Sequence, residues 1–202
     1  MMKLYFSPLS PYVRKVSMTA AIKNLASRLE TIAADTNTGD NVLNARNPLA
    51  KIPCLLTEGG DAIYDSNVIC EYLDATGSGP MLFPRGGDAR WRTLTLGALA
   101  DGILDASLLI VYEKRFRPED RHVQSWLDRQ QSKIDRALAH LENAPPKWSG
   151  HPDYGHVTLA CALGYQDLRF EGRWRAGHPR LVAWLDAISA AVPSFEATRP
   201  AA

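Results

Sequence analysis

The chain has 202 residues, of which 46% are hydrophobic and 22% are charged, a composition typical of an ordinary globular protein. Its 23 Lys and Arg residues nearly balance 22 Asp and Glu residues, and no block of like charge occurs, so binding to nucleic acid through a basic face is not expected. The first residues do not form a signal peptide, and no run approaches the roughly 20 apolar residues of a membrane span, so we expect no membrane association.

The cysteine residues indicate a reducing compartment. The chain has 3 of them, Cys54, Cys70 and Cys161, which lie far apart and are odd in number. Such a set favours free thiols and a cytoplasmic location over a disulfide framework. Because no Cys-x-x-Cys pair occurs, redox chemistry of the thioredoxin type, run on protein thiols alone, is excluded.

Residues 1–76 predict a small α/β domain that begins with a βαβ unit. Residues 2–6 predict a strand, and residues 28–33 predict a second strand. Between them, Ser10 and Pro11 indicate the start of a helix that ends near residue 23, because Ser is a good N-cap and Pro is favoured at the first helical position. A strand, a helix and a strand in this order predict two parallel strands.

The rest of this domain predicts two more strands and a helix. Residues 35–47 are polar and predict an irregular segment. Residues 52–57 and 62–64 predict a hairpin around the turn at 58–61, and Ser66 then caps a helix with an apolar face. The order βαβ-ββα is that of a thioredoxin-like domain.

The remainder of the chain predicts an all-α domain. Gly and Pro are dense at 77–88, which indicates a linker, and residues 89–202 carry apolar residues at helical spacing. The expected helices cover residues 91–115, 118–141, 157–170 and 179 onward, with Pro118 and Pro179 as helix starts. The helix at 157–170 is apolar on nearly all sides, so we expect it to be central and buried.

Three short segments of the first domain resemble one family of proteins. They are SPLSPYVR at 7–14, NPLAKIP at 47–53, and the pair Asp65-Ser66, which begins twelve residues after the last Pro of the second segment. Together they resemble the glutathione site of the glutathione S-transferase family, and SPYVR is similar to bacterial and tau- or theta-like members of the serine type. The resemblance implies the family's fold, a thioredoxin-like α/β domain followed by an all-α helical bundle.

The resemblance implies that the chain activates the thiol of its co-substrate glutathione as a thiolate, for attack on a small apolar electrophile in detoxification. It assigns glutathione binding to Lys51, Ile52, Pro53, Asp65 and Ser66. The γ-glutamyl carboxylate needs donors, such as the Ser66 hydroxyl and N–H at a helix N-terminus, and the α-amino group needs an acceptor such as Asp65. Lys51 would receive the glycine carboxylate, and the Ile52 backbone would pair with the glutathione peptide if Pro53 is cis.

Ser10 is the predicted catalytic residue. A hydrogen bond from its hydroxyl, together with the field of the helix N-terminus, would lower the thiol pKa by roughly one to three units. Ser7 and Tyr5 are rival hydroxyl groups, because other classes of the family use a Tyr or an earlier Ser. The alternative role of Ser10 is that of a helix cap, and the two roles are compatible if the hydroxyl points outward.

The resemblance also implies a second-substrate pocket. Candidate lining residues are Tyr12, Leu108 and Tyr112, with Arg115 and Trp174 as further candidates. No metal site is expected, since the His and Cys residues between 151 and 161 are spaced at five and do not share a helix face. Many family members begin the buried helix with a Ser/Thr-x-x-Asp box, and the stretch 156–159 here predicts a weaker cap.

A homodimer is the assembly that the resemblance implies, with the helix at 91–115 in the interface. The small residues of this helix would permit close approach of another helix; they are Gly97, Ala98, Ala100 and Gly102. Asp101 and Asp105 share one helix face, where they are either interface acids that reach the neighbour's glutathione or part of an exposed polar stripe.

Two alternative functions stay open beside the transferase. The chain could be an interaction protein that binds glutathione without turnover. It could also be a glutathione-dependent reductase of disulfides or peroxides, although a serine instead of a cysteine at Ser10 weighs against a mixed disulfide at that position.

Overall fold

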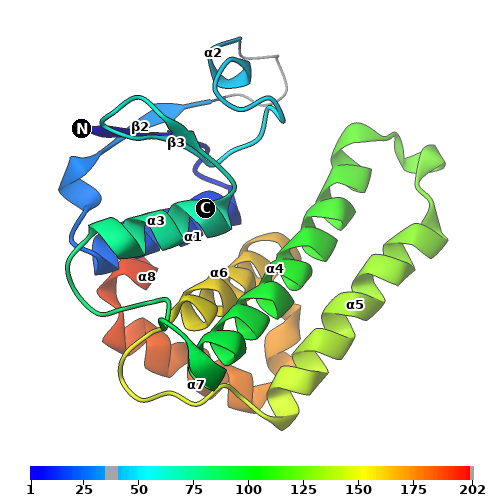
Figure 1. The fold of residues 1–202 in the computed structure, drawn as a ribbon. Helices are drawn as coiled ribbons and strands as arrows, with labels where there is room; N and C mark the ends of the chain where they lie inside the picture. The colour runs from blue at the N-terminus through cyan, green and yellow to red at the C-terminus, as the bar shows by residue number, and fades with distance from the viewer. Residues whose placement is uncertain (35–40, 201–202) are drawn as a thin grey trace. The chain divides into compact units, whose positions relative to one another are not determined.

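The computed structural model describes residues 1–34 and 41–200, which form two compact units (Figure 1). The first unit comprises Met1–Arg85 together with the segment from Val192 onward, and the second comprises Gly86–Ala191. The first unit contains the strands, and the second is built from helices, which confirms the predicted fold class.

The sheet of the first unit has the strand order β2-β1-β3-β4. β1 (Met2–Phe6) pairs in parallel with β2 (Leu29–Ala33), as the βαβ pattern predicted. On its other side, β1 pairs antiparallel with β3 (Cys54–Leu56), which pairs antiparallel with β4 (Ala62–Ile63). Because β3 and β4 are antiparallel, the start of β3 lies beside the end of β4. The loop before β3 and the start of the helix after β4 are therefore at the same end of these two strands.

Two helices of the first unit pack against each other beside the sheet (Figure 1). α1 (Pro11–Ile22) begins after Ser10 as predicted, and the 3₁₀ turn η1 (Ala26–Arg28) leads from it into β2. α3 (Ser66–Thr76) follows β4. Both helices contribute apolar side chains to the core; the largest buried ones are Val13, Val16, Met18, Ile69 and Leu73.

One element of the first unit was not predicted. The segment 35–47 was expected to be irregular, but it contains the short helix α2 (Asn41–Asn44), and residues 35–40 lie outside the described residues. Leu43 of α2 is buried against Tyr5 and Cys54 of the sheet. So few apolar side chains in a polar segment give no periodic signal, which explains why sequence reasoning missed this turn of helix.

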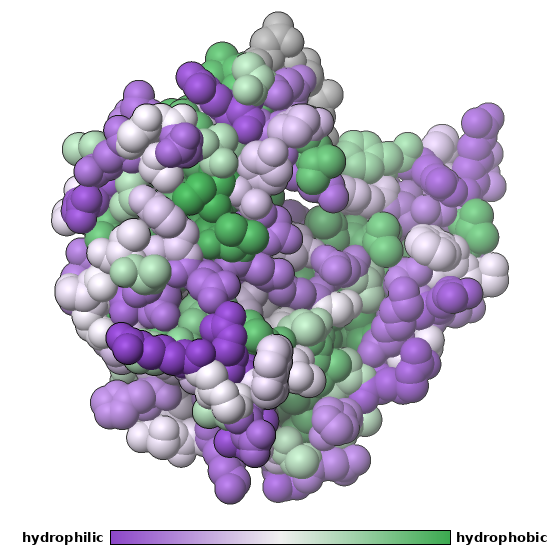
Figure 2. Space-filling model, in the orientation of Figure 1, coloured by the Kyte–Doolittle hydropathy of each residue, from purple (hydrophilic) through white to green (hydrophobic). Residues whose placement is uncertain are grey.

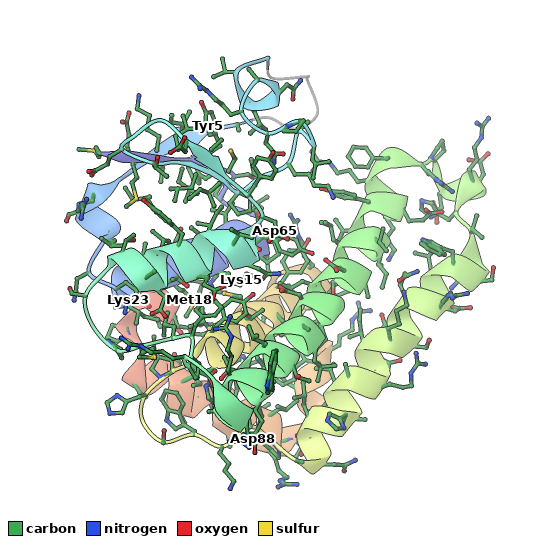
Figure 3. The ribbon with its side chains drawn as sticks, in the orientation of Figure 1. Tyr5, Lys15, Met18, Lys23, Asp65 and Asp88 are labelled. Carbon is green, nitrogen blue, oxygen red and sulfur yellow. The ribbon has the colours of Figure 1, made fainter. Side chains whose placement is uncertain are left out.

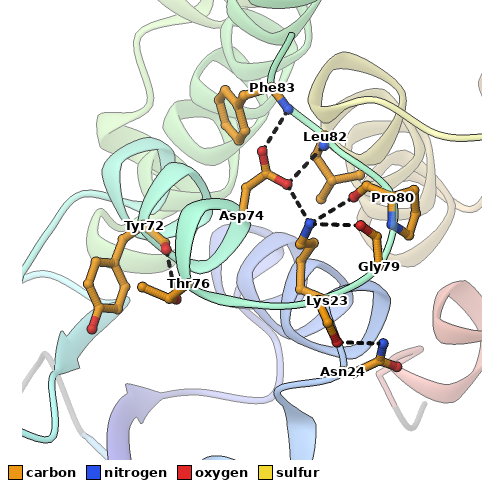
Figure 4. A network of polar contacts seen from close by, with 10 residues as sticks. Lys23, Asn24, Tyr72, Asp74, Thr76, Gly79, Pro80, Leu82 and Phe83 are labelled. Atoms are coloured by element: carbon orange, nitrogen blue, oxygen red, sulfur yellow. Dashed lines mark hydrogen bonds and ion pairs between the residues drawn. The ribbon is translucent and has the colours of Figure 1, made fainter. Parts of the chain in front are cut away.

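A buried ion pair fastens the chain that leaves α3 (Figure 4). Lys23, at the end of α1, places its Nζ 3.0 Å from Oδ1 of Asp74, and the two side chains are only 4% and 8% exposed. The ammonium also donates to two carbonyl oxygens of the linker, those of Gly79 (3.3 Å) and Pro80 (2.9 Å). The Asp74 carboxylate accepts two linker N–H groups, those of Leu82 (2.9 Å) and Phe83 (3.0 Å). The first part of the predicted linker is therefore held in place, because its backbone groups supply the hydrogen bonds that both buried charges need.

The last helix belongs to the first unit. α8 (Pro193–Ala197) packs against α1, where Arg14 donates from Nη2 to the carbonyl oxygen of Phe195 at 2.7 Å. The Arg14 guanidinium carbon also lies 4.4 Å from the centre of the Phe195 ring. The C-terminal domain predicted at 89–202 therefore differs from the second unit at its end, because a buried arginine of α1 binds the final segment.

The second unit is a bundle of four main helices. They are α4 (Gly87–Phe116), α5 (Gln124–Asn143), α6 (Tyr154–Phe170) and α7 (Pro179–Ala191). The 3₁₀ turns η2 (Glu119–Arg121) and η3 (Arg173–Gly177) precede α5 and α7. Pro118 was expected to open α5, but it opens η2 instead, and α5 begins after Val123. Trp126, in the first turn of α5, is exposed.

Close packing of α4 against α6 depends on glycine. A Cβ atom on Gly97 would lie 2.5 Å from Cε1 of Tyr154, and one on Gly155 would lie 2.8 Å from the carbonyl oxygen of Thr93. Farther along, Gln166 donates to the hydroxyl of Ser107 at 2.5 Å. The small residue at 97 therefore serves packing within the chain.

The helix α4 is long and apolar. By length and composition it could cross a membrane, although no run of that kind was expected from the sequence. This is weak evidence for a membrane span, since the core helix of a globular protein passes the same test. α4 packs against both α5 and α6 within the second unit.

The start of α6 is strongly capped, so the predicted weak cap is wrong. The helix begins at Tyr154 instead of 157, and Asp153 forms a capping box with His156: the His156 N–H donates to Asp153 Oδ1 at 2.9 Å, and the Asp153 N–H donates to Nδ1 of His156 at 3.1 Å. Thr93 also donates to Asp153 Oδ2 at 2.6 Å. Burial, the largest influence, raises the pKa of Asp153, but its hydrogen bonds to His156 and Thr93 and the charge of His156 outweigh it and lower the pKa overall.

Asp153→Asn should make the chain less stable at neutral pH but not in strong acid. A carboxyl group with a lowered pKa in the folded state stabilises that state above its unfolded pKa of about 3.9, and this contribution disappears as the pH falls through the folded pKa. We expect a deficit of about 1 kcal/mol in the free energy of unfolding at pH 7, where charge-assisted bonds are lost. Urea unfolding at pH 7, 5, 4, 3 and 2 measures it.

Asp88→Asn is the matched control, because Asp88 is exposed and its charge pairs with that of Arg92 at 4.0 Å across one helical turn. A deficit of Asp153→Asn that persists unchanged below pH 3 would contradict the titration argument.

Candidate functional site

Ser10 lies where the sequence placed it, at the N-cap of α1. Its backbone is extended, and the N–H of Val13 donates to the Ser10 hydroxyl oxygen at 3.3 Å. This capping bond uses a lone pair of the hydroxyl oxygen and leaves the hydroxyl proton free to donate. No hydrogen bond donated by this hydroxyl occurs within residues 1–34 and 41–200. The group can therefore cap the helix and donate to a ligand at the same time.

The rival hydroxyl groups differ in their surroundings. Tyr5 is only 3% exposed and packs with Leu43 and Cys54 in the core of the first unit. Figure 3 shows it within the sheet, whereas Asp65 lies at the start of α3. Ser7 is half-buried in the loop before α1, and its carbonyl oxygen accepts the N–H of Ser10 at 3.1 Å. Tyr5 is therefore poorly placed to reach a ligand, while Ser7 and Ser10 both border the start of α1.

The loop before β3 is organised by Asn47, a residue to which sequence reasoning gave no role. Asn47 is buried; it donates from Nδ2 to the carbonyl oxygen of Lys51 at 2.8 Å and accepts the N–H of Leu49 at 3.0 Å. The N–H of Ala50, whose φ is +52°, donates to the carbonyl oxygen of Asn47 at 2.8 Å. The signal for this role is the Asn-Pro pair, because Asn side chains commonly bond their own backbone two residues on.

The predicted binding residues of this loop follow directly. Lys51 is exposed, Ile52 is half-buried, and Pro53 is buried at the start of β3. The Ile52–Pro53 peptide is cis, the isomer on which the predicted pairing of Ile52 depended. The charged group of Lys51 is thus accessible, next to a backbone segment held by Asn47.

The start of α3 corrects one detail of the sequence interpretation. Asp65, not Ser66, is the N-cap, and its Oδ1 accepts the N–H of Asn67 at 3.0 Å. Ser66 is the first helical residue and is buried, and no hydrogen bond of its hydroxyl occurs in the described part of the chain. Asp is as good an N-cap as Ser, so the two could not be separated by propensity. The carboxylate and the hydroxyl still lie side by side at a helix N-terminus, where N–H groups favour an anion.

A buried lysine supports this helix start. Lys15 is 0% exposed and donates from Nζ to Oδ1 of Asn67 at 2.7 Å. Figure 3 shows it on α1, beneath the start of α3 that Asp65 marks. Sequence reasoning missed Lys15, because a lysine within an amphipathic helix resembles an ordinary solvated residue.

The residues suggested for a second pocket belong to both units. Tyr12 is half-buried on α1 in the first unit, whereas Leu108 and Tyr112 lie on α4 in the second unit, half-buried and exposed respectively. Arg115 is exposed near the end of α4. Trp174 is buried, with its indole N–H donating to Asp167 at 2.8 Å, so its ring serves the packing of η3.

The cysteine thiols are placed as core residues. Cys54, Cys70 and Cys161 are all buried and form no disulfide. Burial raises the pKa of the Cys54 thiol, against a smaller lowering by the charge of Arg46. A raised pKa disfavours the thiolate, so Cys54 is a weak nucleophile. Within residues 1–34 and 41–200, no group of three His, Cys, Asp or Glu residues could hold a metal ion.

A cavity of about 400 Å³ lies at the other end of the sheet. It is lined by Met2, Leu25, Arg28, Glu58 and Tyr72, among others, and by none of the predicted glutathione residues. This cavity is therefore not the candidate site, which is made up of Ser10, the 47–53 loop and the start of α3.

Asp101 and Asp105 were predicted to be either interface acids or part of an exposed polar stripe. Asp101 is half-buried on α4, and the hydroxyl of Tyr154 donates to its Oδ2 at 3.4 Å, while Asp105 is exposed. Asp101 therefore takes part in the contact between α4 and α6, and the two acids differ in exposure although they share a helix face.

Comparison with known proteins gives the family. The N-terminal domain of glutathione S-transferases matches residues 9–76, and the C-terminal domain matches residues 124–187. The uncharacterized GST-like protein YibF of Escherichia coli strain K12 is 34% identical over 203 residues, covering 98% of both chains.

Solved structures agree with this comparison. A glutathione transferase family member from Pseudomonas fluorescens Pf-5 with bound glutathione is 45% identical, covers 100% of both chains and has a TM-score of 0.95. The Pseudomonas protein with bound S-(propanoic acid)-glutathione is 44% identical over 100% of both chains, with a TM-score of 0.90. A glutathione S-transferase from Methylobacillus flagellatus KT with bound glutathione is 33% identical over 100% of both chains, with a TM-score of 0.87. With its sheet, its cis Ile52–Pro53 loop, its helical second unit and these matches, the chain belongs to the glutathione S-transferase family.

Proposed function

We propose that this chain is a serine-type glutathione transferase, tau- or theta-like, that acts in the cytoplasm on a small electrophile. The observation that carries the proposal is the Ser10 hydroxyl, which accepts one bond from the N–H of Val13 and keeps its proton for a ligand. Donation to the glutathione sulfur, in the field of the α1 N-terminus, favours the thiolate over the thiol. The thiolate then forms a bond to an electrophilic carbon and gives a thioether. Either a leaving group departs from that carbon with its bonding electron pair, or the electron pair of an activated double bond moves to the neighbouring atom and takes up a proton from water.

Glutathione binding is assigned to the residues around the 47–53 loop and the start of α3. The hydroxyl of Ser66 and the N–H groups at the start of α3 receive the γ-glutamyl carboxylate, and Asp65 accepts the α-amino group. The backbone of Ile52, next to Pro53, pairs with the peptide of glutathione. Lys51 is exposed and receives the glycine carboxylate.

The relatives support transfer over the alternative functions. The Pseudomonas structure with S-(propanoic acid)-glutathione holds a thioether of glutathione, which is the kind of product a transferase makes. A reductase that forms a mixed disulfide needs a reachable protein thiol, and all three cysteines here are buried. Tyr12, Leu108 and Tyr112 remain the residues proposed for the apolar part of the second substrate.

A homodimer is proposed as the assembly, with the exposed face of α4 in the interface. Gly97 and Ala100 are buried within the unit, whereas Ala98 and Gly102 are exposed on the opposite face. That face also carries large exposed side chains at helical spacing, among them Trp91, Leu109 and Phe116. Hydrophobic residues interrupt the mainly hydrophilic surface in Figure 2. Asp101 is proposed to reach the neighbour's glutathione in such a dimer.

Light scattering at micromolar concentration should give twice the chain mass of 22.3 kDa. A charge on the exposed α4 face, introduced by Gly102→Glu, should shift the mass toward that of one chain, because a buried unpaired charge opposes association. Ala139→Glu, at an exposed position of α5, is the control that should keep the wild-type mass. A wild-type protein with the mass of one chain would contradict the proposed homodimer.

Glutathione should bind the protein at millimolar concentration or below, and the bound thiol should titrate below its free pKa of about 8.5. Ser10→Ala should raise the bound thiol pKa by about one unit or more and change glutathione affinity less, because the other contacts lie elsewhere. Titration calorimetry measures the affinity, and thiolate absorbance against pH measures the pKa.

Ser7→Ala and Tyr5→Phe serve as the matched variants for the Ser10 assignment. Loss of the cap in Ser10→Ala costs about 1 kcal/mol of stability, so unfolding is followed in parallel. A titration that moves only in Ser7→Ala or Tyr5→Phe would move the assignment to that residue. Absence of glutathione binding in the folded wild type would defeat the proposed function.

Asn47→Ala should weaken glutathione binding several-fold and lower the free energy of unfolding by about 1–3 kcal/mol, because a buried amide holds the Lys51 and Leu49 backbone. Titration calorimetry and urea unfolding measure the two effects. Asn44→Ala, at an exposed residue of α2, is the control and should change neither. Equal effects of the two substitutions would mean that Asn47 does not organise the loop.

A further inference from the structure

The cavity of about 400 Å³ at the end of the sheet is separate from the residues proposed to bind glutathione. Its lining comes from β1, from the segment around η1, from the β3–β4 hairpin and from α3, all within the first unit. Small-molecule sites in proteins have volumes of roughly 300 to 1,000 Å³. The cavity is therefore large enough for a small organic molecule, such as one ring with a short side chain.

Part of the lining is apolar. Met2 and Leu25 are each 3% exposed, and Ile63 of β4 is half-buried. Tyr72 of α3 is half-buried as well, and its ring points away from the buried ion pair drawn in Figure 4. A hydrophobic ring that enters the cavity is removed from water by these side chains, which favours its binding.

One ion pair in the lining is already complete. Arg28 donates from Nη2 to Oε1 of Glu58 at 3.0 Å, and the N-terminal ammonium of Met1 lies 3.4 Å from the same oxygen. Glu58 therefore has two cationic partners, and the charge of Arg28 is balanced within the wall of the cavity.

Asp61 is the other charged residue that lines the cavity. Its backbone is fixed in the hairpin, because its N–H donates to Oγ1 of Thr57 at 3.1 Å and its carbonyl oxygen accepts the N–H of Thr57 at 2.9 Å. Among the residues that the structure describes, no cation or hydrogen-bond donor contacts its carboxylate, and the Tyr72 hydroxyl has no partner there either. The cavity thus keeps one negative charge and one hydroxyl for a ligand.

We propose that this cavity binds a small organic cation, namely an ammonium group attached to an apolar ring. The ammonium pairs with Asp61 and donates to the Tyr72 hydroxyl, while the ring packs against Met2, Leu25 and Ile63. The tyrosine ring adds to this preference, because the face of an aromatic ring attracts cations. The site lies outside the proposed transferase reaction and uses none of the residues assigned to it.

The preference for a cation over an anion follows from the pairing of charges in the lining. The guanidinium of Arg28 is held by Glu58 at 3.0 Å, so an anion has to compete for it. An ammonium at Asp61 displaces no contact made by the described residues. Because the Asp61 side chain is exposed, the gain from its ion pair is modest, and the apolar contacts supply the rest of the affinity.

An NMR titration of the amide signals tests the site with three probes of similar size, at low ionic strength because salt screens exposed charges. The probes are the cation phenethylammonium, the neutral phenethyl alcohol and the anion hydrocinnamate. The cation should bind with millimolar affinity or better, about threefold to fivefold more tightly than the alcohol, and the anion should bind more weakly than both. The signals that move should belong to residues 57–63 and 72–76, which contribute to the lining.

Asp61→Asn keeps the size of the side chain and removes its charge. In this variant the ratio of the affinities for cation and alcohol should fall to about one, while the affinities for the alcohol and for glutathione stay unchanged. Asp120→Asn is the matched control, because Asp120 is an exposed aspartate of η2 in the second unit and its loss should keep the wild-type ratio.

Three results would overturn the proposed cation site. They are a cation preference that persists in Asp61→Asn, tighter binding of the anion than of the cation, and the absence of binding of every probe at millimolar concentration. Signals that move only outside the lining would overturn it as well. A wild-type protein that binds the cation but not glutathione would count against the transferase function alone.

Discussion

Burial of three cations on α1 is the constraint on which the first unit depends. Arg14, Lys15 and Lys23 are all buried, and a buried charge is costly unless it is paired or hydrogen-bonded. Each of them therefore binds a different part of the unit. Arg14 holds the carbonyl of Phe195 in α8, Lys15 holds Asn67 at the start of α3, and Lys23 holds Asp74 and the linker. α1 is thereby bonded to the C-terminal helix α8, to the start of α3 and to the linker that follows α3.

The candidate site uses the same helix in a different way. The first N–H groups of a helix have no partner within it, so each helix start must offer them an acceptor. Ser10 and Asp65 supply one acceptor each, to Val13 and to Asn67. The remaining N–H groups, the hydroxyl proton of Ser10 and the hydroxyl of Ser66 are donors, which suits a ligand with a thiolate and a carboxylate. Lys15, one of the three cations, thus also holds the start of α3, against which such a ligand would rest.

In the second unit, α4 divides its residues between two environments. Gly97 lies against α6, where a larger side chain would collide with Tyr154, and Ala100 is buried, whereas Ala98 and Gly102 are exposed. One helix thus carries the packing of the unit and the proposed contact with another chain.

The sequence by itself determined the order of the elements and most of the candidate site. Alternating and helical spacing, together with Ser10-Pro11, the NPLAKIP segment and Asp65-Ser66, is local information, and local residue preferences decide caps, turns and strands. Only the tertiary structure decided that Asp65 instead of Ser66 caps α3, that Asp153 caps α6, that α8 joins the first unit and that Asn47 and Lys15 are buried supports. These features depend on acceptors far away in the chain or on a choice between two equally good caps, and a periodic pattern carries no record of which distant groups meet when the elements pack.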